Sequence, residues 1–276
     1  MLTQRTSSSP LTWSLPIAAL MVVSSLSGLI VPSVYAQETV NWMLQAQGQD
    51  VGNLIAAVVL LLSAQRYRAG SHRAGAVWLG TLLYVIYAFV VYAMAVHFSP
   101  LFLVYVAVLG LSAWAVIRHI DAFRATPPPV PTAPALRLAG WTLIATGILF
   151  GGLWLSELIP ATASGQLPAS LEEAGLWVNP IHVIDLSVVL PAFVITGLGA
   201  LRLRADGLAW TAPWLTFSAL MGTSIVAAML LIAGHGFPGT LPPTVMVSVV
   251  VLVSLAALVR FLAGAPQPAR VPAPLR

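Results

Sequence analysis

The sequence alternates between long apolar segments and short polar ones, and this alternation limits the fold more than any other feature. About 20 apolar residues in a helix cross the ~30 Å hydrocarbon core of a bilayer. We therefore predict an all-α protein, a polytopic transmembrane helix bundle with eight hydrophobic segments, or seven if the first is removed. The predicted helices cover about 11–36, 42–66, 75–97, 101–117, 138–158, 180–201, 209–233 and 244–262.

Composition agrees with a membrane protein and excludes several kinds of chemistry. The chain is 59% hydrophobic and 7% charged, whereas a soluble domain carries roughly 25% charged residues. It has no cysteine, which excludes disulfides and thiolate catalysis. It also has no lysine, which excludes a Schiff base to retinal or pyridoxal phosphate. The expected partner is the lipid bilayer, and no cofactor is indicated.

The charges predict an orientation. All 12 basic residues are arginines, and they fall on one side of the membrane if the helices alternate in direction. Six of the eight carboxylates fall on the other half. Because arginine marks the cytoplasmic side, the C-terminus should be cytoplasmic. The same placement accounts for the net charge of +4 without nucleic acid as a partner.

The chain divides into three parts. Residues 1–36 have a short basic region, an apolar core and a small residue at 36, which fits either a cleaved signal peptide or a retained signal anchor. Residues 37–265 form the transmembrane helical domain. Residues 266–276 are rich in proline, alanine and arginine and should be a disordered cytoplasmic tail.

The second segment is unusually polar. Its purely apolar part, 54–62, is too short to cross the bilayer. If the helix extends back from Arg66 to about residue 42, four polar residues lie inside the outer leaflet: Gln47, Gln49, Asp50 and Asn53. The alternative is an exposed loop over 37–50 followed by a short helix that tilts or thins the membrane.

The sixth segment carries ionisable groups into the membrane. Asn179 can cap this helix and Pro180 suits its first turn. His182 and Asp185 are then three residues apart, on one face. A kink is expected at Pro191.

We expect a ligand- or proton-binding site near the outer surface, since intramembrane ionisable groups usually face a cavity or the bundle interior. Its candidate residues are Asp50, His182, Asp185, Glu157, Asn53 and Tyr87. On this hypothesis the second and sixth segments are neighbours and their aspartates share a proton or cation. His182 and Asp185 are also candidate metal ligands. Alternatively, neighbouring polar groups satisfy Asp185, while Glu157, His97 and His235 lie in headgroup water.

Three functional classes stay open at this stage. The first is a non-enzymatic membrane protein that binds an ion, a proton or a small ligand. The second is a membrane enzyme acting on a lipid or periplasmic substrate, with His182 and Asp185 as acid/base groups. The third is a structural or assembly partner. The sequence has no metalloprotease, serine-elbow, Walker or dinucleotide motif, and it does not indicate an oligomeric state.

Several segments resemble an uncharacterised family of bacterial multi-pass membrane proteins with no assigned activity. The resemblance covers about residues 42–205 and is carried by Gln49-Asp50, Gly70-Ser71-His72-Arg73, Tyr84-x-x-Tyr87, Phe102-Leu103-Val104-Tyr105 and Asn179-Pro180-Ile181-His182-Val183-Ile184-Asp185. It implies a bacterial inner-membrane setting and transfers no catalytic or binding residue.

Overall fold

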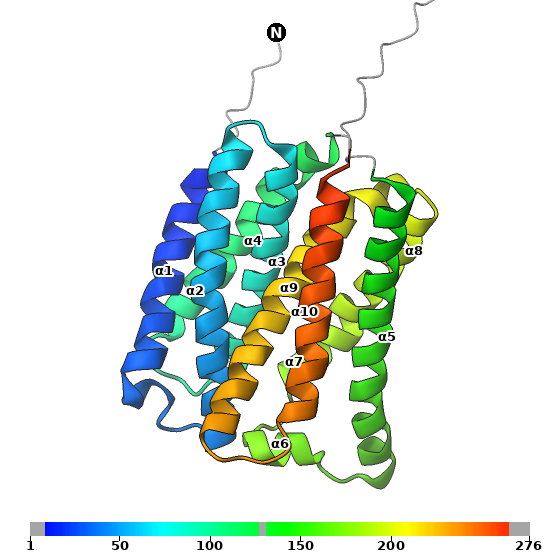
Figure 1. Ribbon diagram of the computed structural model, residues 1–276. Helices are drawn as coiled ribbons and strands as arrows, with labels where there is room; N and C mark the ends of the chain where they lie inside the picture. Colours follow the sequence, from blue (N-terminus) through cyan, green and yellow to red (C-terminus); the bar gives the residue numbers. More distant parts are fainter. Residues whose placement is uncertain (1–8, 127–130, 265–276) are drawn as a thin grey trace, which may run out of the picture.

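The computed structural model describes residues 9–126 and 131–264, and every regular element in these ranges is a helix (Figure 1). Eight of the helices described are long and apolar enough to cross a membrane, which confirms the predicted fold class. They are α1 (Pro10–Ile30), α2 (Val40–Arg68), α3 (His72–Ala95), α4 (Phe102–Arg124), α5 (Ala133–Ser164), a composite crossing (Pro180–Leu201), α9 (Ala205–Gly234) and α10 (Leu241–Leu262). The predicted tail, 266–276, lies outside the described residues.

The helices form two four-membered rings. In the N-terminal ring, defined as α1 to α4, each helix packs on the next and α4 packs back on α1. The C-terminal ring consists of α5, the composite crossing, α9 and α10, and α10 packs back on α5. Helix α9 joins the rings because it also contacts α2 and α3. In Figure 1 the N-terminal ring lies on the left and α5 and α8 lie on the right.

Small residues allow α2 and α9 to approach closely. Gly48 and Gly52 are four residues apart on α2, and a side chain at either position would overlap with Ala228 or Ser224 on α9. Gly48 meets Ala228 and Gly52 meets Ser224, as expected for antiparallel helices with matched small-x-x-x-small faces. Within a membrane such faces bring backbones together and maximise van der Waals contact.

Helix α2 is continuous from Val40, so the polar-helix prediction is confirmed and the exposed-loop alternative is wrong. The Thr39 hydroxyl accepts a hydrogen bond from the Trp42 backbone N–H at 3.2 Å and caps the helix. The buried Trp42 indole donates to the Ala95 carbonyl of α3 at 2.6 Å. These contacts hold the polar first half of α2 inside the bundle.

The sixth crossing contains a π-helical turn that the sequence did not predict. It consists of α7 (Pro180–Ile184), the π turn (Asp185–Val189) and α8 (Leu190–Leu201). The Leu190 N–H donates to the carbonyl of Asp185, five residues earlier. Pro191, where a kink was expected, has no N–H for Ser187, and the wider turn lies directly before it. Such turns are frequent at functional sites.

The second and sixth crossings are not neighbours, which corrects the sequence-based expectation. Helix α2 packs on α1, α3 and α9, whereas α8 packs on α5 and α9. Helices α3 and α9 therefore separate the two crossings. From that region the short helix α6 (Ala169–Ala174), which the sequence left as part of a loop, reaches α2. There the Thr39 hydroxyl donates a hydrogen bond to the Glu173 carbonyl at 2.8 Å.

Helix α1 packs into the N-terminal ring against α2 and α4. Ile17 and Met21 are completely buried, and the Ser14 hydroxyl accepts a hydrogen bond from the buried Trp78 indole at 2.8 Å. The short 3-10 helix that follows, η1 (Pro32–Tyr35), places the Tyr35 ring inside the bundle.

This packing predicts that residues 10–36 stay with the mature protein. Removal would leave the Trp78 indole without its acceptor and expose the apolar faces of α2 and α4. Intact mass spectrometry of the protein extracted from membranes should give a mass that includes these residues. A mature chain beginning at Gln37 would show instead that the segment is a signal peptide.

Candidate functional site

The residues expected to form one site do not lie together. Asp50 is enclosed by the N-terminal ring, whereas Asp185 lines a cavity between the C-terminal ring and helices α2 and α3. Asp50 is not among the residues that line this cavity. The structure therefore gives the two carboxylates separate surroundings.

Asp50 is held by two tyrosine hydroxyls. Tyr35 donates to Oδ2 and Tyr92 donates to Oδ1, both at 2.8 Å, and 1% of Asp50 is exposed. Burial, together with the nearby carboxylate, raises the pKa of the Tyr35 hydroxyl, so it stays protonated and donates. Gly28 lets α1 pass directly over this pair, since an added Cβ would overlap with Asp50. Both carboxyl oxygens are engaged, and the arrangement is that of an internal structural contact.

Asn53, another candidate, belongs to a polar network at the joint between the rings. Its side-chain oxygen accepts hydrogen bonds from Tyr84 and Gln49, each at 3.1 Å. The Tyr84 hydroxyl also shares a 2.7 Å hydrogen bond with Ser224 of α9. Asn53 is completely buried, so it links α2 to α3 and does not itself face the cavity. This network also satisfies the Tyr84 hydroxyl.

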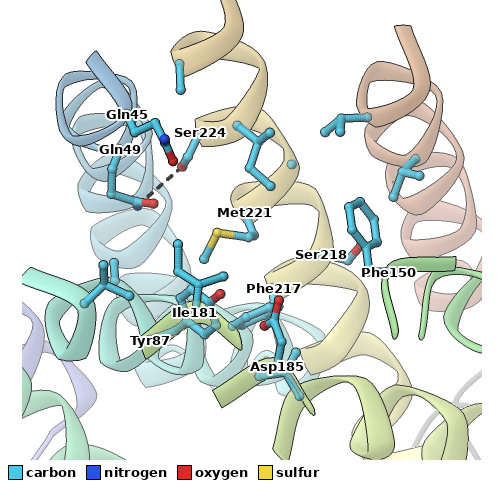
Figure 2. Close-up of a pocket in the computed structure, with 18 of the residues that line it drawn as sticks. Gln45, Gln49, Tyr87, Phe150, Ile181, Asp185, Phe217, Ser218, Met221 and Ser224 are labelled. Carbon is cyan, nitrogen blue, oxygen red and sulfur yellow. Dashed lines mark hydrogen bonds between the residues drawn. The ribbon is translucent and has the colours of Figure 1, made fainter. Parts of the chain in front are cut away.

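Asp185 lies in a cavity of about 300 Å³. The cavity reaches from Trp42 and Pro243, near the end of the bundle that carries α6, to Phe193 and Phe217 deeper inside. Its lining is mainly apolar, with seven aromatic residues and three methionines. In Figure 2, Asp185 and Gln49 lie on opposite sides of Met221, so the polar groups stand at two ends of an apolar space.

The Asp185 carboxylate is oriented by neighbours from other helices. The Trp154 indole of α5 donates to Oδ2 at 2.8 Å, and the Tyr87 hydroxyl of α3 interacts with the same group. The structure thus brings together Tyr87 and Asp185, two of the candidate residues named from the sequence. Sequence reasoning missed Trp154, because an indole in an apolar helix is not distinguishable from an ordinary packing residue.

His182 and Glu157 do not line this cavity. His182 is buried, packs against the Trp154 ring with centroids 4.7 Å apart, and lines a separate hollow of about 640 Å³ next to Trp177. Its Nε2 has no hydrogen-bond partner within the described residues. Glu157 accepts a hydrogen bond from the Ser170 backbone N–H at 3.1 Å, which fixes the first turn of α6.

The remaining histidine and carboxylate groups do not assemble into a metal centre. No group of three histidine, aspartate or glutamate side chains in residues 9–126 and 131–264 could hold a metal ion. His97 is exposed and its Nδ1 lies 3.0 Å from Glu38. His235 is also exposed, and its Nδ1 hydrogen-bonds to the Leu231 carbonyl at 2.9 Å. Both positions suit headgroup water, as the alternative interpretation proposed.

Comparison with known proteins adds no further assignment. No family model, curated protein or solved structure matches the chain. Function must therefore be inferred from the geometry of the cavity and the residues around it.

The Asp50 cluster predicts a loss of stability on removal of one donor. Tyr35→Phe leaves the ring in place but deprives Oδ2 of its hydrogen bond. Since hydrogen bonds between membrane helices contribute about 0.6–1.7 kcal/mol, the free energy of unfolding in detergent should fall by about 1 kcal/mol.

Tyr67→Phe is the matched control. The Tyr67 hydroxyl has no hydrogen bond within the described residues, while its ring packs near Trp78 with centroids 5.7 Å apart. This variant should keep the stability of the parent protein. Equal losses in both variants would show that the Tyr35–Asp50 hydrogen bond contributes nothing specific.

Proposed function

We propose that this protein is a membrane-embedded binding protein for a small, mainly apolar molecule that occupies the Asp185 cavity. One observation carries the proposal: a single carboxylate and a few amide and hydroxyl groups converge on an otherwise apolar hollow inside the bundle. Small-molecule sites are typically of this kind, with apolar walls of about 300–1,000 Å³ and a few oriented polar groups. The polar groups at the far end from Asp185 are Gln45, Gln49 and Ser224 (Figure 2).

An acid/base enzyme is less well supported by the same geometry. His182 and Asp185 lie three residues apart on the composite crossing, but they line different hollows. A substrate in the Asp185 cavity would therefore meet the carboxylate without the imidazole. A purely structural role leaves the cavity unexplained.

We further propose that the bundle lies in a bacterial inner membrane with the cavity opening on the periplasmic side. The arginines of the described helices sit at or next to ends that come together as the chain alternates in direction, such as the end of α2, the start of α3 and the end of α10. Arginine-rich ends are retained in the cytoplasm. Trp42 and Pro243, at the mouth of the cavity, belong to the opposite end.

The orientation predicts which loops can be labelled from outside. The chain has no cysteine, so single-cysteine variants carry no background. Ala69→Cys and Gln166→Cys place thiols at exposed positions on opposite ends of the bundle. In intact cells a membrane-impermeant maleimide should label only the cysteine at 166, and both should react after lysis. Labelling of both, or only of 69, in intact cells would contradict the orientation.

The cavity predicts specific stabilisation by a small amphipathic molecule. We choose 4-phenylbutanol as the probe, because it has an apolar body and one polar group. A ligand that binds the folded state alone stabilises it by about 2.7 kcal/mol at 100 times its Kd. The thermal unfolding midpoint of the purified protein should therefore rise with probe concentration, and above the Kd it should keep rising with the logarithm of that concentration.

Two matched substitutions on α10 locate the effect. Val250 lines the cavity, whereas its neighbour Val249 is 54% exposed on the outer face. Val250→Phe should fill part of the cavity and abolish stabilisation by the probe, while Val249→Phe should leave it unchanged. The same response in both variants would mean that the probe acts through the detergent or the outer surface.

A further inference from the structure

We infer that the ligand of this cavity is an organic monocation, with a protonated amine held by Asp185 and an apolar body in the rest of the space. The inference rests on the binding function proposed above and narrows it to one chemical class. Three features of the cavity support it: its charge, its free acceptor capacity and its aromatic wall.

The lining of the cavity, over the residues that the structure describes, contains one acidic side chain and no basic side chain to pair with it. Asp185 is the sole charged side chain among the described residues that line it, and the lining includes no arginine and no histidine. Within the described part of the chain, the one ion pair joins His97 and Glu38, so no basic side chain neutralises Asp185. A carboxylate in apolar surroundings is stabilised by a proton or by a cation. Because no side chain among the described lining residues supplies that cation, a bound ligand can supply it.

The carboxylate also has acceptor sites to spare. A carboxylate offers about four lone-pair positions. In the described residues, the Asp185 carboxylate accepts a hydrogen bond from the Trp154 indole at 2.8 Å and interacts with the Tyr87 hydroxyl, which leaves acceptor positions open. Asp50 provides the contrast, because a tyrosine hydroxyl engages each of its oxygens and it lies outside the cavity. Asp185 is thus oriented but not saturated, which is the state required of a residue that binds an N–H group.

The wall around the carboxylate suits a cation with apolar substituents. Tyr87 packs against Phe217 with ring centroids 5.5 Å apart, and Phe193 follows at 5.9 Å from Phe217. All three rings line the cavity, and aromatic faces attract cations within about 6 Å. The thioethers of Met221, Met229 and Met246 adapt to irregular apolar groups. An anion would meet repulsion from Asp185 with no basic side chain to offset it.

Three probes with the same frame test this inference on the purified full chain at neutral pH. They are 4-phenylbutylamine, which is cationic, 4-phenylbutanol, which is neutral, and 4-phenylbutanoate, which is anionic. The Kd of each is measured by isothermal titration and by the shift in unfolding midpoint. We expect the amine to bind on the order of tenfold more tightly than the alcohol and the anion to bind more weakly than either.

Substitutions at Asp185 assign the preference to its charge. Asp185→Asn keeps the shape of the side chain and should erase the advantage of the amine while alcohol binding persists, which also shows that the variant is folded. Asp185→Glu should keep the preference for the amine. Val250→Phe should weaken amine and alcohol together, which separates the cavity from partition into the micelle.

The outcomes distinguish this inference from the function on which it rests. If alcohol and amine bind equally in the parent protein, the cavity binds small molecules but the cation inference is wrong. If the amine keeps its advantage in Asp185→Asn, its charge is recognised elsewhere and the inference is again wrong. If none of the three probes binds, the proposed function itself fails.

Discussion

The close contact between α2 and α9 is the interaction on which the rest of the structure depends. Gly48 and Gly52 bring the two backbones together against Ala228 and Ser224, and this contact joins two rings that otherwise meet mainly through α3. The same approach puts Gln49 and Ser224 at one end of the cavity. In a membrane, where lipid and leucine are equally apolar, such close packing replaces the hydrophobic effect as the source of helix association.

The N-terminal ring encloses the Asp50 carboxylate, and the C-terminal ring borders the Asp185 carboxylate. The two carboxylates differ in their hydrogen-bond partners. The Asp50 carboxylate is closed in by tyrosines from η1 and α3, so its hydrogen bonds hold the turn after α1 against the bundle. Asp185 is the first residue of the π turn, and its carboxylate accepts a hydrogen bond from the Trp154 indole of α5. An ionisable group in the membrane requires partners; for Asp50 the protein supplies them on both oxygens, and for Asp185 it supplies fewer.

The apolar periodicity was sufficient to predict eight crossings, because membrane spans are recognisable from length and composition alone. The polar first half of α2 was also predictable, since Arg66 fixes one end of the helix and the bilayer thickness fixes the other. The separation of Asp50 from Asp185 could not be predicted, because it depends on which helices are neighbours. Neither Trp154 nor the small-residue face of α2 was identified in advance, since Trp and Gly are common in membrane helices for many reasons. The π turn was not predicted either, because Pro191 indicates a kink but not the local backbone geometry of the turn before it.

The two-ring arrangement also bears on how the protein is made. A chain entering the membrane from its N-terminus releases α1 to α4 first, and α4 packs back on α1. The N-terminal ring can thus close while α5 to α10 are still being synthesised, because domains generally fold as units during translation. The glycine face of α2 would then already be formed when α9 enters the membrane. Biogenesis of this protein is expected to be a two-step process in which the first half serves as the surface on which the second half assembles.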